Sequence, residues 1–253
     1  MFTILSKRRT VHVDCFTCDP IAFHAKMAPA SDFFPEWWKN TARKNECPYY
    51  KSGVENTIKS CIGLVDLYKN AFIQPSWIEI NFDITSTQDT LDVRLTCSDT
   101  KTTFSQHSNS QFNLFASDTE TQNIKLVNPW KYSSNKSAKF LMIEPTWDQF
   151  HFYNHVSVMP GVVDLKQINY MNINYLIRYH DGINQLCKIN AFDPLFMIVP
   201  LSNADIKFHH HFVQSNDPRL ISAPQYLINN QFRDPRDVTS TKKQIKKIGN
   251  FLN

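Results

Sequence analysis

Glycine is scarce in this chain, with only 5 glycines among 253 residues. Phosphate-binding loops need glycine where the backbone approaches a ligand closely, and neither GxGxxG nor GxxxxGKS/T occurs. The GxSxG elbow that presents the nucleophile of α/β-hydrolases is also absent. The acidic residues are scattered, and nothing in the sequence pairs them. These absences argue against a nucleotide-dependent enzyme and against a hydrolase of that kind.

Long apolar runs are lacking as well. No run approaches the roughly 18 apolar residues of a membrane helix, so we expect no membrane span. The first residues do not have the pattern of a signal peptide. The 6 cysteines are irregularly spaced, which favours reduced thiols in a protein made in a cytoplasm. The net charge is only +4 and most Lys and Arg residues are scattered, so no specific nucleic acid is expected as a partner.

Aromatic residues, in contrast, are abundant at 13% of the chain, and they suit the half-buried surfaces of β-sheets. Residues 156–202 alternate apolar and polar side chains in short runs, which is typical of strands joined by tight turns. These runs end at Pro160-Gly161, Asp181-Gly182, Asp193-Pro194 and Pro200. The same alternation predicts a first strand within residues 1–18, where TVHVDCF alternates, and strands at 76–84 and 90–97.

One clear helix is predicted at residues 55–70, where the apolar side chains favour one side. Because helices do not alternate with the strands, we predict a mainly β fold. It would be an antiparallel β-sandwich or jelly-roll-like domain with one early helix. The domain is expected to span residues 1–213, with an aromatic-rich loop at 19–53. Residues 214–253, the C-terminal arm, are expected to be extended and to end in a short basic helix.

One potential metal site begins in the first predicted strand. His12 and Asp14 are two residues apart, so on a strand they point the same way and can chelate one ion. This spacing occurs in 2-oxoglutarate-type non-haem iron enzymes; His209 would complete the triad, with Arg219 downstream. In those enzymes several strands precede the first ligand, whereas only 11 residues precede His12. An ordinary edge strand is therefore the favoured interpretation, and no metal or other cofactor is expected.

Two further kinds of potential ligand, the other histidines and a pair of cysteines, lack chelating geometry. His151 and His155 would share one face of a strand but lie roughly 13 Å apart along it. In the run His209–His211, the outer two histidines share a face and the middle one opposes them. Cys15 and Cys18 form a CxxC motif without the second close pair of a zinc ribbon. Structural roles are favoured for all of these residues.

Two segments are candidate protein interfaces. The aromatic loop includes Phe34 and the adjacent pair Trp37 and Trp38, which cannot easily both be buried on one face of a strand or helix. We expect one tryptophan to pack on the core and the other to meet a neighbouring loop, subunit or ligand. The C-terminal arm has few apolar residues between its prolines, so it should be ordered only by lying on another surface. Its candidate interface residues are Tyr226, Phe232, Lys243, Lys246 and Lys247.

Several motifs occur in a fixed order along the chain: a WWK patch, a helix start, a Pro-Gly-Val strand and an apolar run that ends at proline. They lie in FFPEWWKN and in residues 57–84, 159–177 and 189–202. With these motifs the chain resembles an uncharacterised family encoded by tailed phages, especially those of marine bacteria, over roughly residues 33–202. It departs from the family pattern at Ile62, where proline is expected, and at Phe192, where glycine is expected. The resemblance implies a viral gene product and brings no catalytic assignment.

Two functions therefore remain open. The first is a non-enzymatic phage virion structural protein that binds neighbouring subunits in a capsid, neck or tail assembly. Its partners would be copies of itself or other virion proteins, and it would be made in the host cytoplasm. The alternative is a metal-dependent jelly-roll enzyme similar to the non-haem iron oxygenases, with His12, Asp14 and His209 as ligands.

Overall fold

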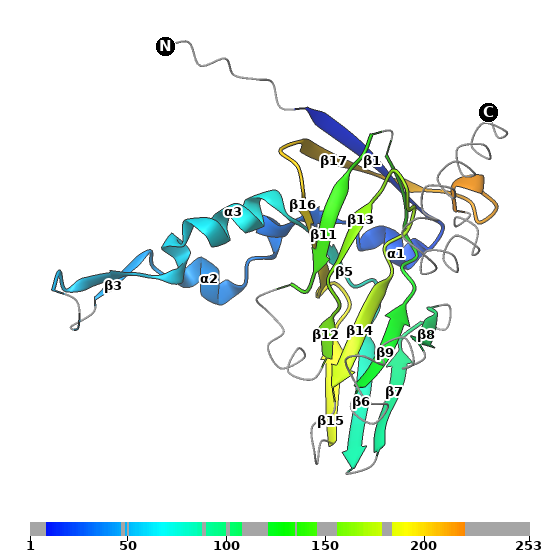
Figure 1. Cartoon of the computed structure of the whole chain (residues 1–253), viewed down its shortest axis with the longest axis horizontal. Helices are drawn as coiled ribbons and strands as arrows, with labels where there is room; N and C mark the ends of the chain where they lie inside the picture. The colour runs from blue at the N-terminus through cyan, green and yellow to red at the C-terminus, as the bar shows by residue number, and fades with distance from the viewer. Residues whose placement is uncertain are drawn as a thin grey trace, which may run out of the picture.

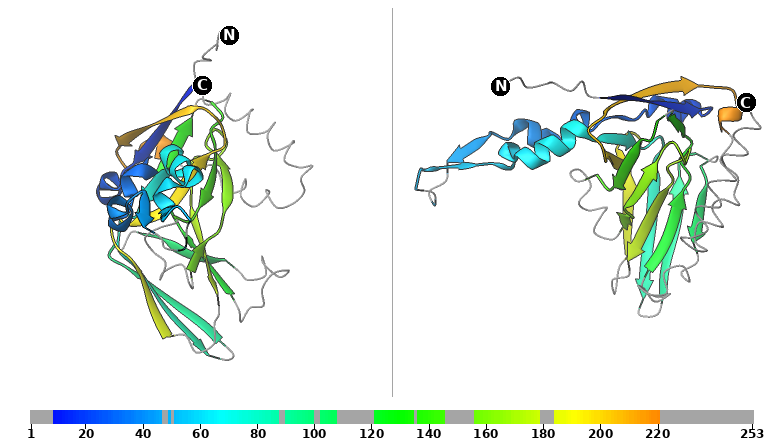
Figure 2. Two further views of the ribbon diagram at one scale, coloured as in Figure 1. Left: turned by 90° about the vertical axis from the view of Figure 1, so that its left-hand side faces the viewer. Right: turned by 45° about the horizontal axis from the view of Figure 1, so that its top comes forward.

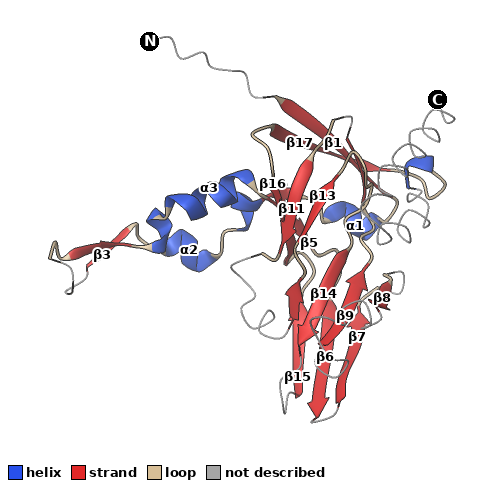
Figure 3. Ribbon diagram, viewed as in Figure 1, coloured by secondary structure: helices blue, strands red, loops and turns tan. Residues whose placement is uncertain are grey.

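Strands dominate the computed structural model, and the predicted mainly β class is confirmed (Figures 1 and 3). His151, His155 and the C-terminal arm beyond residue 220 lie outside the residues that the structure describes. The described residues are 9–46, 49, 51–87, 90–99, 102–107, 121–134, 136–145, 156–178 and 184–220. No helix within these ranges is long and apolar enough to cross a membrane.

Two antiparallel sheets pack face to face in one half of the molecule (Figure 2). Because alternate residues of a strand point to opposite faces, Phe82 and Tyr175 both turn inward and meet with ring centroids 5.2 Å apart. The first sheet has the order β12-β14-β9-β8, formed by Val156–Val158, Ile173–Arg178, Thr121–Leu126 and Phe104–His107. The second has the order β15-β6-β7, formed by Asn184–Ile189, Ile80–Thr87 and Thr90–Cys97.

A five-stranded antiparallel sheet continues the body. Its central strand, β16, is buried on both faces over Pro194–Ile198, which explains the continuous apolar run there. The large buried side chains of the main core include Trp77, Trp130 and Phe140. The sheet has the order β13-β11-β16-β5-β2, formed by Gly161–Asp164, Lys139–Ile143, Pro194–Pro200, Phe72–Pro75 and Ala28–Pro29.

A three-stranded sheet brings together segments that are far apart in the sequence. Its order is β10-β1-β17, formed by Lys131–Ser134, Thr10–Thr17 and Asp205–Phe212. The central strand β1 is antiparallel to β10 and parallel to β17. Figure 1 shows β1 and β17 side by side along the top of the molecule. β17 is an edge strand, and β1 is its partner in this sheet.

The helices are short, and the main one begins later than predicted. The segment expected as one helix at 55–70 divides into β4, a 3-10 turn and α3. Val54–Asn56 pairs with β3, Lys44–Glu46, so its first residues are extended rather than helical. Thr57 then accepts a hydrogen bond from the backbone N–H of Lys59 and starts the 3-10 turn. The helical segments are α1 Pro20–His24, η1 Ala30–Phe33, α2 Glu36–Asn40, η2 Ile58–Ser60, α3 Ile62–Asn70 and η4 Pro218–Leu220.

The two positions that depart from the phage-family pattern have distinctive backbone roles. Ile62 is the first residue of α3, where proline is favoured because its fixed φ suits a helix start. Phe192 lies in the turn between β15 and β16 with a φ of 71°, the left-handed region that favours glycine. Its side chain is nevertheless 55% exposed, so burial contributes little to offset this strain.

Candidate functional site

Polar side chains cover the outer face of the β1–β17 pair. Alternate residues of β1 turn Val11, Val13 and Cys15 into the core, so His12, Asp14 and Phe16 share the opposite face. The parallel register places Asp14 beside His209 and Phe16 beside His211. Together with Phe16, which is itself buried, these residues form a strip, hereafter the histidine strip, consisting of His12, Asp14, Phe16, His209 and His211.

Two pairs of contacts hold the histidine strip together. The Nδ1 atom of His12 lies 2.8 Å from Nε2 of His209, and the two rings stack with centroids 5.1 Å apart. Nε2 of His211 lies 2.9 Å from Oδ1 of Asp14. The sequence-predicted residues His12 and His209 are therefore neighbours, although 197 positions separate them. Asp14, the third predicted ligand, is bonded to His211 instead.

A charged group closes one end of the histidine strip. The ring of Phe16 stacks on His211 at 5.0 Å, and the guanidinium carbon of Arg219 lies 4.6 Å from the Phe16 ring centroid. Arg219 also donates two side-chain hydrogen bonds to the carboxylate of Asp217, of 2.9 and 2.6 Å. Side-chain and backbone hydrogen bonds from Arg219 lower the pKa of Asp217 to about 2. The start of the C-terminal arm is thereby fastened to β1.

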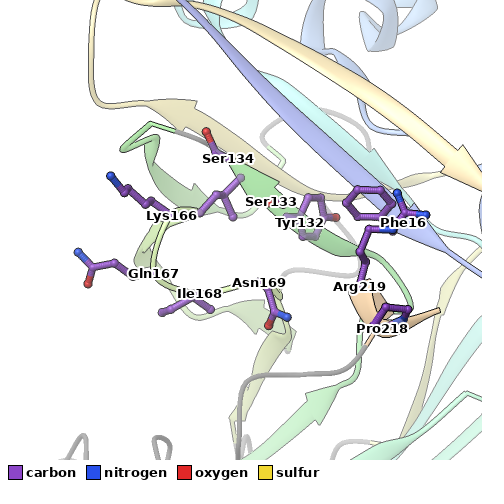
Figure 4. A pocket seen from close by; sticks show the side chains of 11 residues that line it. Phe16, Tyr132, Ser133, Ser134, Lys166, Gln167, Ile168, Asn169, Pro218 and Arg219 are labelled. Carbon is purple, nitrogen blue, oxygen red and sulfur yellow. The ribbon is translucent and has the colours of Figure 1, made fainter. Parts of the chain in front are cut away.

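A pocket of about 360 Å³ opens beside this end of the histidine strip (Figure 4). Arg219 extends toward Phe16, while Lys166 and Gln167 lie on the other side of the opening. His211 and Arg219 already stack on the Phe16 ring, and Asp217 already pairs with the Arg219 guanidinium. The Phe16 ring and the Arg219 guanidinium therefore already have partners, and neither gives a reason to assign this pocket as a ligand site. The lining residues are Phe16, Tyr132, Ser133, Ser134, Leu165, Lys166, Gln167, Ile168, Asn169, Pro218 and Arg219.

His210 points the opposite way from its two neighbours, as strand geometry predicts. Its ring lies edge-on to Trp130, with centroids 5.3 Å apart. Burial, followed by the positive charge of Lys26 and the neighbouring imidazoles, lowers the pKa of His210 to about 4. The side chain is therefore neutral at pH 7. Among the described residues, no hydrogen-bond partner reaches its Nε2 atom.

The other potential metal ligands do not converge. Cys15 is buried and Cys18 is exposed, so the CxxC motif does not present two thiolates to one point. All five described cysteines are free thiols, and Cys47 lies outside the described residues. In the described part of the chain, no three or more His, Cys, Asp or Glu side chains form a group that could hold a metal ion.

A second candidate site projects from the β-body. Residues 36–70, here named the projecting arm, contain α2, the β3–β4 hairpin and α3, and Figures 1 and 2 show them extending away from the sheets. The base of the arm packs on β5 and β16 through a small core of Ala30, Tyr68, Ala71, Ile73 and Met197. The hydroxyl groups of Thr57 and Ser60 donate hydrogen bonds to the carbonyl oxygens of Ala42 and Arg43. These bonds join the two chain segments that lead to the hairpin.

The adjacent tryptophans of the projecting arm have different environments. Trp38 is buried and stacks on Phe34, with centroids 5.1 Å apart, and Phe34 stacks in turn on Tyr68 at 4.9 Å. Trp37 lies edge-on to Trp38 and is 44% exposed. The expectation that one of the two tryptophans packs is confirmed for Trp38, and a contact of Trp37 with a subunit or ligand stays a prediction. Trp38 and Tyr68 of the projecting arm therefore pack on Phe34, which precedes the arm, and the Trp37 side chain is partly exposed.

Exposed apolar side chains are concentrated on the projecting arm. Tyr49 is 95% exposed and Ile62 is 76% exposed. The large exposed apolar residues of the arm are Trp37, Tyr49, Val54, Ile58 and Ile62. The other proposed interface residues, Tyr226, Phe232, Lys243, Lys246 and Lys247, lie outside the described residues.

Comparisons of the chain with protein-family models, with curated proteins and with solved structures find no match. The histidine strip offers nitrogen and carboxylate ligands, and the projecting arm offers an apolar surface.

Proposed function

We propose that this chain is a non-enzymatic structural protein of a phage virion. It binds neighbouring subunits in a capsid, neck or tail assembly, as a homo-oligomer or with other virion proteins. The observation that carries this proposal is the projecting arm, which extends away from the sheets and exposes Tyr49 and Ile62. The resemblance of residues 33–202 to a family encoded by tailed phages supports a place in the virion after synthesis in the host cytoplasm.

The construction of the projecting arm is the physical reason to expect a partner. An isolated two-stranded hairpin is at best marginally stable in water, and β3–β4 forms a sheet of two strands. Both strands are short, and within the described residues each pairs with the other alone, so each has an edge to which another chain could add. Contact with a neighbouring subunit would cover Tyr49 and Ile62 and would stabilise the hairpin.

The beginning of the C-terminal arm fits the same proposal. Arg219 fastens residues 217–220 to β1 through its contacts with Phe16 and Asp217. The following residues thus depart from a fixed point on the body. We propose that they bind a neighbouring subunit, with Lys243, Lys246 and Lys247 facing acidic groups and Tyr226 and Phe232 supplying apolar contact.

The proposal is tested by removing exposed apolar side chains from the projecting arm without touching its core. The double variant Tyr49→Ser and Ile62→Ser should fold like the wild type, because both side chains are exposed. It should form smaller assemblies in light scattering and should be lost from purified particles. Leu186→Ser is the matched control, because Leu186 is 62% exposed but lies on the body in β15. Normal assembly of the double variant would contradict the proposal.

A second candidate function is the metal-dependent jelly-roll enzyme similar to the non-haem iron oxygenases. The 2.8 Å approach of His12 and His209 favours it. The contact of Asp14 with His211 leaves the facial triad unformed, and neither His12 nor His209 lines the described pocket. Oxygen consumption by the purified chain with Fe(II) and 2-oxoglutarate, lost in His12→Ala, would favour this enzyme over the structural protein.

A further inference from the structure

We propose that His12 and His209 bind a divalent transition-metal ion, of the zinc or cobalt kind, on the outer face of the β1–β17 pair. The ion would link strands from the two ends of the described chain. This inference goes beyond the assembly proposal and requires no catalytic activity. It also revises the expectation, drawn from the sequence alone, that no metal is bound.

The positions of two nitrogen atoms carry the inference. Nδ1 of His12 and Nε2 of His209 face each other at 2.8 Å. Zinc binds imidazole nitrogen at about 2.0–2.1 Å in a tetrahedral arrangement, which places two nitrogen ligands roughly 3.3 Å apart. Small rotations of the two rings would open the observed distance by roughly 0.5 Å and admit the ion. Both rings are exposed, so water can complete the coordination.

In the observed structure Asp14 does not converge with His12 and His209, so the site as it stands has two protein ligands, and Asp14 would join them only if its side chain turned. Asp14 shares a face of β1 with His12 and lies beside His209 in the register of the two strands. Its carboxylate contacts Nε2 of His211 at 2.9 Å in the structure. Turning toward the ion would break that contact and give two imidazoles and one carboxylate. His211 would then be free to hydrogen-bond a water molecule on the metal.

The surrounding charges limit the affinity and help to select the ion. Lys207 lies beside His12 in the register and is exposed, so its ammonium group opposes a cation. The negative charge of Asp14 offsets this repulsion. Imidazole nitrogen suits zinc, cobalt and nickel, whereas magnesium and calcium prefer oxygen ligands. We therefore expect micromolar binding of transition metals and no comparable response to magnesium.

Metal binding should also strengthen the association of β17 with the body. In its sheet β17 pairs with β1 alone, and a ligand that binds only the folded state raises its stability. An ion held by His12 and His209 would lock the two strands in register. The temperature of unfolding should therefore rise on metal addition, by an amount that grows with metal concentration.

The test uses the full chain, stripped with chelator and titrated with Zn²⁺ or Co²⁺ at about pH 7.5. The wild type should bind one ion per chain and melt several degrees higher with metal. His12→Gln and His209→Gln should each lower the affinity at least tenfold, and Asp14→Asn should lower it less. His24→Gln is the matched control, because His24 is exposed on α1 and is not part of the histidine strip. It should bind like the wild type.

Each variant is compared with its own metal-free form, so a change in intrinsic stability does not obscure the result. Equal affinity in the wild type and both histidine variants would overturn the proposal. The absence of any metal-induced shift in the wild type, or an equal shift with Mg²⁺, would also overturn it. None of these results bears on the projecting arm, whose test is assembly rather than metal binding.

Discussion

His210 should make the stability of this protein depend on pH, because its imidazole is held neutral against Trp130. Burial is the largest cause of its lowered pKa, followed by the charge of Lys26. The folded-state pKa is about 4, against the ordinary histidine value of about 6.5. Between these values the unfolded chain takes up a proton that the folded chain does not. Stability therefore falls as the pH falls from about 6.5 toward 4.

The size of the effect follows from that interval. Complete desolvation would correspond to about 3 kcal/mol over the whole range. The ring of His210 is only partly buried, and solvent screening reduces the expected loss to about 1–2 kcal/mol. His210→Phe keeps an aromatic ring beside Trp130 and removes the titration.

Urea unfolding, followed by tryptophan fluorescence, measures this loss at several pH values between 7 and 4.5. The wild type should lose about 1–2 kcal/mol more than His210→Phe over this range. Other titrating groups are common to both proteins, so their contributions cancel in the difference. His24→Phe, at an exposed position, should keep the wild-type pH dependence. Equal pH dependence in the wild type and His210→Phe would refute the assignment.

Three further predictions follow from local geometry. Phe192→Gly should raise the free energy of unfolding, measured in urea, by about 0.5–1 kcal/mol, because glycine adopts the φ of 71° without strain. Phe192→Ala should give no such increase. A lower free energy of unfolding for Phe192→Gly would contradict the argument that Phe192 is strained. Burial, and then the negative charge of Asp14, raise the pKa of the Cys15 thiol. Iodoacetamide should therefore label the exposed Cys18 and Cys61 in the native protein and should label Cys15 only after unfolding. Mass spectrometry of the peptides measures this labelling. Asp19→Ala should lower the free energy of unfolding by about 1 kcal/mol in the same assay, since the Asp19 side chain accepts hydrogen bonds from two backbone N–H groups at the start of α1. Asp19→Asn should retain most of this stability. An unchanged stability of Asp19→Ala would contradict the role of Asp19 as a helix cap.

Strands with clear alternation could be predicted because their cause is local. At β6 and β7 the period of two alone shows which side chains enter the core. The helix was less predictable, since apolar spacing over residues 55–70 does not reveal that Val54–Asn56 pairs with β3. Pairing partners depend on contacts between distant segments, and a local pattern contains no information about them.

The histidine strip shows the same limit at the level of a site. Strand parity correctly placed His12 with Asp14 and separated His210 from its neighbours. The register of β1 and β17 could not be read from either segment. A slip of one residue would turn His209 to the other face, and only the observed register brings it to His12. The same register gives Asp14 a contact with His211 that the sequence did not indicate.

In the projecting arm, the residues that stabilise the fold differ from the residues that we propose to bind a partner, which is not so in the histidine strip. Tyr68 and Trp38 are buried and hold the arm together, whereas Tyr49 and Ile62 are exposed at positions that the folded chain does not need for its core. Selection for stability alone does not explain large apolar side chains at such positions, because water contact gives them no favourable burial energy. Under the proposed function, a partner that covers them would explain their presence. The stacked rings at the base of the arm would then set the direction in which that partner is held.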